Sequence, residues 1–418
     1  MFNKITLSNG VQIIAETIPF VRSIAFGIWV RNGSRNESKE NNGISHFIEH
    51  MLFKGTETRS ASRIADEFDA IGGQLNAYTA KEMTCYYARV LDSHFDQALD
   101  VLSDMFFNSL FSDAEIEKER NVISEEISMS EDSPEDLVTE ILQQNVFPDN
   151  ALAYPILGTT ETISTFNHNT FVDYFLHNYR PENIVIAIAG NFSENETVKK
   201  IERYFGAFPS PEIVYKNPVY NAVYKPCFTK KEKDVEQVHM AISFPGVSLP
   251  DDETYSMTTL NVLFGGGVSS RLFQSVREKY GLVYSIYSYN SGFLDTGLFT
   301  IYAAANPNQI KPAFDVIVQE INKLRTERIS SEYLERTKEQ IKSNILLSLE
   351  NSSSRMSSIG RAQLLLGKIT SPDELIQKID SIDIDALSRT IDSTFIFDKM
   401  SVALVGKTQN ISENDFQI

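Results

Sequence analysis

The sequence predicts an α+β fold of two homologous domains, each a mostly antiparallel sheet with helices packed on one face. Three observations predict it: apolar strands alternate with amphipathic helices, the pattern recurs about 215 residues later, and a proline-rich stretch separates the two copies. The 418 residues are 42% hydrophobic and 11% aromatic, which is enough to fill two or three cores. This composition excludes disordered and fibrous proteins.

The repeat rests on three pairs of segments that match in the same order along the chain. Two pairs have the pattern of buried strands and one that of a helix, at offsets of 214, 216 and 215 residues: 25–30 with 239–244, 184–190 with 400–406, and 98–102 with 313–317. Small loop insertions produce such a drift, and chance similarity among common apolar strings is the alternative. We therefore expect domains at 1–208 and 235–418, joined by a connection at 209–234 that holds four of the 14 prolines.

The first half begins with a predicted hairpin. Asn9-Gly10 lies between short apolar runs at 5–7 and 11–15, and this dipeptide suits the positive φ angles of a hairpin turn. A strand at 25–30, an amphipathic helix between Gly43 and Phe53 and a helix from Ser112 to about Met129 follow.

Charge and cysteine usage narrow the class of partner and the compartment. The formal net charge of −18 disfavours non-specific binding to nucleic acid or to anionic membranes. The two cysteines, Cys85 and Cys227, form no metal or disulfide pattern, which suits a reducing compartment, so we expect a cytoplasmic protein. The sequence shows no pattern of an export signal or a membrane span.

The helix at 44–52 carries the first chemical motif. Its apolar residues fall on one face: Ile44, Phe47, Ile48, Met51 and Leu52. The other face carries His46, Glu49 and His50, whose side chains project within about 100° of one another. This is the H-x-x-E-H order, in which the two histidines bind Zn²⁺ and the glutamate acts as general base. The alternative is a solvated polar face with two incidental histidines.

A catalytic zinc site needs a third protein ligand, and the helix from Ser112 offers two acids. Glu119 and Glu126 are seven residues apart and lie on the apolar stripe that this helix presents, formed by Ile116, Val122, Ile123 and Ile127. Burying two unpaired carboxylates would cost several kcal/mol each, so each needs a partner. That partner is either a divalent cation or an arginine or lysine from elsewhere in the chain.

The second half tests this interpretation internally. At an offset of 214 residues the three motif residues correspond to Leu260, Leu263 and Phe264, and at an offset of 218 Glu119 and Glu126 correspond to Thr337 and Asn344. The fold therefore does not require the polar residues, and we expect only the first half to carry chemistry.

The segment GISHFIEHMLFKGT at 43–56 resembles the signature of the inverted-zincin peptidases, the family of pitrilysin, insulin-degrading enzyme and the mitochondrial processing peptidase. Glu126 stands 76 positions after His50, where this family has its third ligand, and the resemblance covers nearly the whole chain. It implies one zinc ion per chain and these roles: ligands His46, His50 and Glu126, general base Glu49, and Glu119 as an acidic partner of the ligands. It also implies that two such units close around a chamber.

Two further segments gain an interpretation from the resemblance. The segment at 72–80 is similar to the family's edge strand, where Asn76, Ala77 and Tyr78 would pair with a substrate strand; a glycine turn leading into an ordinary strand is the alternative. The segment at 272–284 resembles the one in which Arg277 would bind a substrate carbonyl and Tyr284 the developing oxyanion. An ordinary surface arginine and a half-buried tyrosine are the alternative.

Two other features point to substrate contacts less directly. Gly265-Gly266-Gly267 lacks the residues of a phosphate-binding loop and is interpreted as a mobile loop at the chamber. Ser133 and Pro134 predict the start of another helix, on which Asp136 and Glu140 share a face. In the processing peptidase, acids at these positions hold an arginine near the cleaved bond; an acidic, solvated helix start is the alternative.

The sequence therefore predicts a zinc metalloendopeptidase that hydrolyses unfolded peptides or precursor segments, with a possible preference for basic residues near the cut. The same chain carries the metal motif and both Arg277 and Tyr284, so no different chain is needed to complete the site. We therefore expect a homodimer. A non-catalytic subunit of an assembly, or a subunit of an obligate heteromer, is the alternative.

Overall fold

The two apolar strand copies become central strands of two sheets, β3 (Ser23–Val30) and β8 (Val238–Gly246), in a computed structural model that describes residues 2–209, 221–327 and 329–416. The first sheet has the order β1-β2-β6-β3-β5-β4 and the second β7-β11-β8-β10-β9. The other strands are β1 (Phe2–Thr6), β2 (Gln12–Thr17), β4 (Gln74–Thr79), β5 (Thr84–Leu91), β6 (Ile184–Gly190), β7 (Phe228–Glu232), β9 (Ser285–Gly292), β10 (Gly297–Ala305) and β11 (Ser401–Gly406).

The predicted duplication is visible in the pairing of the strands. Strands β2-β6-β3-β5-β4 occupy the same places in the first sheet as β7-β11-β8-β10-β9 in the second. Each sheet has one parallel pair, and the two pairs are equivalent: β2 with β6 and β7 with β11. The other pairs between described strands are antiparallel, including the one that the additional strand β1 makes with β2. Two mostly antiparallel sheets with one topology confirm the α+β fold of two homologous halves.

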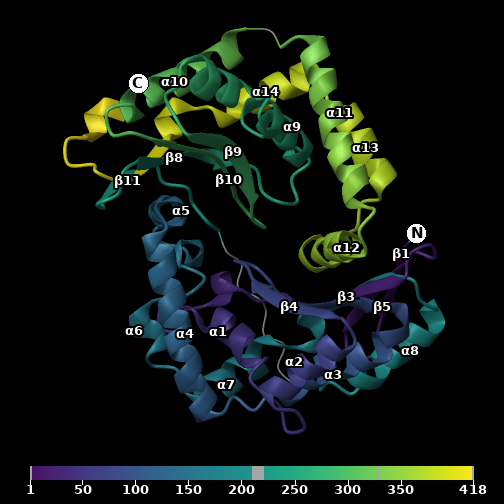
Figure 1. Ribbon diagram of the computed structural model, residues 1–418. Helices are drawn as coiled ribbons and strands as arrows, with labels where there is room; N and C mark the ends of the chain where they lie inside the picture. The colour runs from purple at the N-terminus through teal and green to yellow at the C-terminus, as the bar shows by residue number, and fades with distance from the viewer. Residues whose placement is uncertain (1, 210–220, 328, 417–418) are drawn as a thin grey trace. The chain divides into compact units, whose positions relative to one another are not determined.

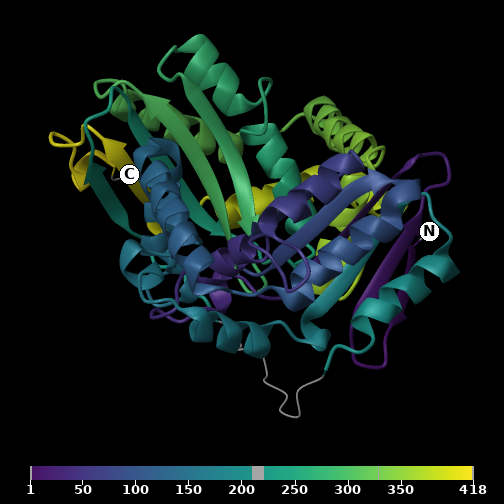
Figure 2. The ribbon, with the colours of Figure 1, turned by 60° about the horizontal axis from the view of Figure 1, so that its bottom comes forward.

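The predicted N-terminal hairpin joins β1 to β2 at the edge of the first sheet. Gly10 has a φ of 100°, in the region where glycine is favoured, and its N–H donates to the Leu7 carbonyl. Helix α8 (Glu194–Phe205) lies beside this hairpin, as Figure 2 shows.

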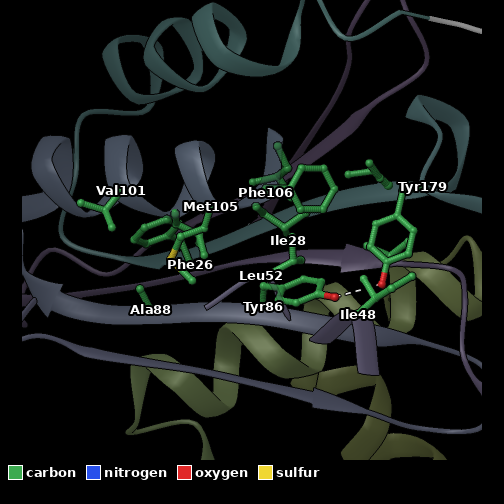
Figure 3. Packing of buried hydrophobic residues seen from close by; sticks show 14 of the residues in the cluster. Phe26, Ile28, Ile48, Leu52, Tyr86, Ala88, Val101, Met105, Phe106 and Tyr179 are labelled. Carbon is green, nitrogen blue, oxygen red and sulfur yellow. Dashed lines mark hydrogen bonds between the residues drawn. The ribbon is translucent and has the colours of Figure 1, made fainter. Parts of the chain in front are cut away.

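The first sheet is covered by helices on both faces. Alternate residues of β3 from Ile24 to Val30 enter a core shared with α1 (Ile44–Met51), α3 (Phe95–Asn108) and α7 (His168–Asn178). Figure 3 shows part of this core around Tyr86 and Phe106. Helix α12 (Ser352–Leu366) packs on the opposite face (Figure 1). Gly360 permits this approach, because a Cβ at Gly360 would lie 2.4 Å from Trp29 Nε1.

The second sheet follows the same plan. One face packs against α9 (Thr254–Phe264), α10 (Ile310–Thr326) and α14 (Ile384–Thr394), and α5 (Pro134–Val146) covers the other face (Figure 1). Small side chains on that other face, Ala241, Ala304 and Ala403, contact the cluster that α5 supplies with Leu137, Val138 and Leu142. Most helices thus lie on one face of each sheet, as predicted, and one extra helix buries the other face.

These extra helices make the two compact units discontinuous in sequence. The first unit comprises Met1–Ile127, Tyr154–Val219 and Leu347–Thr370, and the second comprises Ser128–Ala153, Tyr220–Leu346 and Ser371–Ile418. The predicted ranges 1–208 and 235–418 are continuous, whereas α5 packs with the second unit and α12 with the first. Helix α5 lies in the first predicted range but buries its apolar face on the second sheet, and α12 lies in the second range but packs on the first sheet. The local sequence does not reveal this exchange.

The predicted connection at 209–234 includes a strand of the second sheet. Residues 210–220 lie outside the described residues, while Phe228–Glu232 forms strand β7 and pairs with β11. The remaining helices are α2 (Ala61–Ala70), α4 (Asp113–Asp132), α6 (Thr160–Ile163), α11 (Ser331–Ser348) and α13 (Pro372–Asp380). Among the described residues, we find no helix with the length and apolar composition needed to cross a bilayer.

Candidate metal centre

Helix α1 is fixed in the first unit by the apolar face that the sequence predicted. Ile44, Phe47, Ile48 and Met51 are at most 1% exposed, and Figure 3 shows Ile48 and Leu52 packed beside Tyr86 of β5. This packing turns His46, Glu49 and His50 away from the core.

Helix α4 brings the two candidate acids to α1. Ile116 and Ile123 are at most 1% exposed and hold one side of α4 in the core, with Glu119 4% exposed between them. Val122, which the sequence pattern placed on the same stripe, is 43% exposed, because the buried stripe is narrower than the predicted one.

The two imidazoles and Glu126 converge on one point. The Glu126 Oε2 atom lies 3.7 Å from His46 Nε2 and 3.6 Å from His50 Nε2. Two donors bound to one zinc ion at tetrahedral angles are about 3.4 Å apart, given metal–ligand distances of about 2.0–2.2 Å. One donor atom from each residue lies within 4.8 Å of the other two. The spacing and the chemistry of these donors therefore fit zinc.

Glu119 does not join this cluster but holds one of its members. Glu119 Oε2 lies 3.0 Å from His50 Nδ1, and because a carboxylate only accepts, the ring must carry its proton there. This tautomer leaves the lone pair of His50 Nε2 directed toward Glu126. The Lys54 ammonium lies 2.7 Å from Glu119 Oε1, so a lysine partner serves Glu119, as one alternative predicted, while Glu126 faces the histidines.

The electrostatics favour the ligand form of the other histidine. Burial, followed by the charge of His50, lowers the pKa of His46 to about 3. A neutral imidazole is the form that binds a metal ion.

Glu49 stands next to the cluster without contributing to it. Its Oε2 accepts a hydrogen bond from Thr79 Oγ1 at 2.5 Å, so the hydroxyl orients the carboxylate. Burial raises the pKa of Glu49, and the negative charge of Glu126 adds to this, while the Thr79 bond and His50 oppose it. A raised pKa makes this carboxylate a stronger proton acceptor than an ordinary glutamate. Sequence analysis missed Thr79, because a threonine at a strand end carries no motif.

The strand that ends at Thr79 is the predicted edge strand. β4 lies at the end of the first sheet, paired only with β5 among the described strands. Asn76 and Tyr78 are exposed on one face, and Ala77 packs on the core face. The predicted strand is therefore an edge strand of the first sheet.

Arg277 and Tyr284 belong to the second unit and lie near each other. Arg277 is in the π-helical turn η5 (Phe273–Lys279), and its guanidinium carbon lies 5.7 Å from the centre of the Tyr284 ring. Tyr284 is 74% exposed, not half-buried as one alternative expected. An exposed tyrosine beside an arginine is available to a ligand.

The other predicted substrate contacts also lie in the second unit. Ser133 caps α5 by accepting from the Asp136 N–H, and Pro134 is in the first turn, as predicted. Asp136 is exposed, and Glu140 accepts a hydrogen bond from Gln144. Gly265 packs closely on β9, since a Cβ there would lie 2.4 Å from Ser288 Oγ. The absence of a side chain at Gly265 therefore allows this packing.

Comparison with known families assigns both halves to one group. Residues 12–160 match the family described as Insulinase (Peptidase family M16), and residues 165–341 match the Peptidase M16 inactive domain. The first match contains every residue of the metal cluster.

Individual relatives agree over nearly the whole chain. An uncharacterized zinc protease of Bacillus subtilis, YmxG, is 43% identical over 98% of this chain and 100% of its own length. One of Streptomyces coelicolor is 38% identical over 93% of this chain and 86% of its own length. Among solved structures, a protease from Helicobacter pylori has a TM-score of 0.91 at 20% identity, covering 97% of this chain and 99% of that one, which shows the same fold.

Proposed function

This chain belongs to peptidase family M16, the insulinase family, and from that premise we propose that it is a zinc metalloendopeptidase acting on unfolded peptides. The observation that carries the proposal is the arrangement in the first unit. Three ligand atoms from α1 and α4 converge, while Glu49 lies beside them, outside the ligand set.

The residues divide the chemistry of peptide hydrolysis among them. His46, His50 and Glu126 would hold the zinc ion, which when bound supplies a Lewis acid that polarises the scissile carbonyl and lowers the pKa of water. Glu49 accepts the proton of the attacking water and delivers it to the leaving amine. Thr79 keeps the Glu49 carboxylate in place, and Glu119 keeps His50 in the required tautomer.

The substrate is proposed to bind as an additional strand on β4. The backbone of Asn76, Ala77 and Tyr78 lies along this edge, and the strand ends at Thr79, which contacts the general base. A peptide paired with β4 is therefore led to Glu49 in an extended conformation. An unfolded peptide can offer its backbone in this way along its whole length.

The second unit supplies the remaining parts of the proposal. Arg277 would bind a substrate carbonyl and Tyr284 the developing oxyanion, and Asp136 with Glu140 would prefer a basic side chain near the cut. We propose a homodimer that encloses the substrate in a chamber, and sedimentation of the purified chain as a monomer would contradict it. A cytoplasmic location agrees with the free thiols of Cys85 and Cys227 and is tested by cell fractionation.

The test uses the chain expressed alone, with zinc analysis and a library of flexible quenched peptides. We expect about one zinc ion per chain, hydrolysis that stops when a chelator removes the metal, and recovery when zinc returns. A folded domain that carries a cleaved sequence in a rigid surface should resist. A zinc-loaded protein that cleaves no peptide would instead support a non-catalytic or heteromeric subunit.

A further inference from the structure

Helix α1 carries both histidines but lacks a conventional start. It has eight residues, and its N-cap is Gly43, which has a φ of 96° and provides no side chain to accept from the first turn. A helix this short is marginal by itself, and its first N–H groups need partners when they are buried. Those partners must come from outside the helix.

The Asn41 carbonyl accepts from the Ile44 N–H at 3.1 Å, and a single buried carboxylate accepts from the N–H groups on either side of it. Glu37 Oε2 accepts from the Gly43 N–H at 2.8 Å, and Glu37 Oε1 accepts from the Ser45 N–H at 2.9 Å. Glu37 is 5% exposed and lies six residues before the N-cap, so it caps the helix from a separate loop. Its negative charge also lies at the helix end where the macrodipole favours an anion.

The loop that contains Pro155 and Gly158 fixes both Glu37 and the start of α1. Asn42 Nδ2 donates to Glu37 Oε2 at 2.9 Å and also lies 2.9 Å from the Pro155 carbonyl. Gly43 is pressed against Gly158, since a Cβ at Gly43 would lie 2.7 Å from the Gly158 Cα. The start of α1 is therefore held at one place relative to the loop that contains Pro155 and Gly158.

The position of the start of α1 determines the directions of the His46 and His50 side chains. Ser45, whose N–H binds Glu37, immediately precedes His46, and the Ser45 hydroxyl lies 3.1 Å from both Tyr174 Oη and Asn32 Nδ2. Glu126 comes from another helix, so a small rotation or shift of α1 would change both histidine distances to it. A metal site tolerates such displacements poorly.

We propose that Glu37 is a positioning residue of the metal centre, which acts through the backbone of Gly43 and Ser45 to hold His46 and His50 at the geometry zinc requires. This inference rests on the proposed function, because it assumes that these histidines bind zinc. It adds a residue that neither touches the metal nor belongs to the H-x-x-E-H motif.

The experiment compares Glu37→Gln with Glu16→Gln in the full chain. Glu16 is a matched control, because it is 7% exposed in the same unit and its carboxylate pairs with Arg355 of α12. The glutamine side chain has one acceptor oxygen, whereas the N–H groups of Gly43 and Ser45 each bind a separate carboxylate oxygen of Glu37. We expect the zinc affinity of Glu37→Gln, measured by chelator competition, to fall about 10–100-fold, the usual cost of losing an outer partner of a metal ligand.

Further readouts separate positioning from general stability. We expect the visible spectrum of the cobalt-substituted Glu37→Gln protein to differ from that of the wild type, and the spectrum of Glu16→Gln to match it. If Glu37→Gln does not fold, Glu37→Asp tests the inference instead. Its shorter carboxylate keeps the charge but cannot reach both N–H groups. We expect Glu37→Asp to lose less zinc affinity than the loss expected for Glu37→Gln.

The outcomes are distinct. Unchanged zinc affinity and an unchanged cobalt spectrum in the folded variants at position 37 would overturn the inference alone. Equal losses in Glu37→Gln and Glu16→Gln would also overturn it, since they would indicate general destabilisation. A wild-type chain that binds no zinc would overturn the proposed function and this inference together.

Discussion

The two units share a sheet topology but differ at two pairs of equivalent helices, α1 with α9 and α4 with α11. At the positions of His46, Glu49 and His50, the second unit has side chains that are at most 1% exposed in its core, Leu260, Leu263 and Phe264. At the positions of Glu119 and Glu126 it has Thr337 and Asn344. The first unit gathers a polar cluster at these positions, whereas α9 of the second unit buries leucine and phenylalanine in its core.

This difference shows that the polar residues are not needed for folding. The second unit has the same topology with leucine and phenylalanine, whose burial stabilises the fold. His46 and His50 are partly exposed, and in the proposed function they serve to bind zinc. Substitutions at equivalent positions should therefore change metal binding in one unit and stability in the other.

The largest expected effect comes from His50→Ala set against Phe264→Leu. Loss of a ligand should reduce zinc affinity by more than the 10–100-fold that loss of an outer partner costs, and peptide hydrolysis should fall with it. Phe264→Leu should leave zinc affinity unchanged and lower the free energy of unfolding by about 1–2 kcal/mol. Chelator competition and chemical denaturation measure the two, and equal zinc affinities would remove His50 from the ligand set.

Removing the metal should affect the two units unequally. Because zinc at 1,000 times its dissociation constant stabilises the state that binds it by about 4.1 kcal/mol, the apo protein should exchange the amide hydrogens of α1 faster. The amides of α9 provide the internal control and should not change. Hydrogen exchange followed by mass spectrometry measures both, and parallel acceleration of α1 and α9 would contradict a role confined to the first unit.

A smaller effect is expected at Lys54. Lys54→Met removes the cation 2.7 Å from Glu119 and leaves that buried carboxylate to accept a hydrogen bond from the neutral His50 ring. We expect zinc affinity about 10-fold lower, the low end of the range for outer partners of a ligand. Lys118→Met, which removes an exposed ammonium from the same helix pair, should have no effect; equal losses in both variants would exclude a specific role.

The smallest expected effect concerns specificity. If Asp136 and Glu140 grip a guanidinium, the double variant Asp136→Asn with Glu140→Gln should lose a preference for arginine two residues before the cut and retain its zinc. Added salt should weaken the preference of the wild type, because part of the attraction is long-range. A cleavage map of a peptide library tests this, and a map without basic enrichment in the wild type would end the hypothesis.

The sequence predicted the parts that local patterns determine. The period of the apolar residues predicted α1, and the acids on an apolar stripe predicted that α4 carries partners for the histidines. Three matched segments predicted the duplication. The two helix signals depend on residues within one helix, and the duplication depends on comparing short segments, each of which has the pattern of one helix or strand.

What the sequence did not predict depends on contacts between distant segments. Gly360 has no motif, yet it allows α12 to approach Trp29, about 330 residues away in the chain. Glu37 lies in a polar stretch that resembles an ordinary loop, and Thr79 ends an ordinary strand. Their roles appear only when the fold places them against α1.

The central claim is that Glu49 performs proton transfer beside a zinc ion it does not bind, and Glu49→Gln tests it most directly. The variant should contain as much zinc as the wild type and hydrolyse flexible peptides at least about 100–10,000-fold more slowly, because only the proton acceptor is lost. Glu125→Gln, an exposed glutamate next to Glu126, should keep both zinc and activity. A Glu49→Gln protein that has lost its zinc, or that hydrolyses peptides at the wild-type rate, would contradict the account.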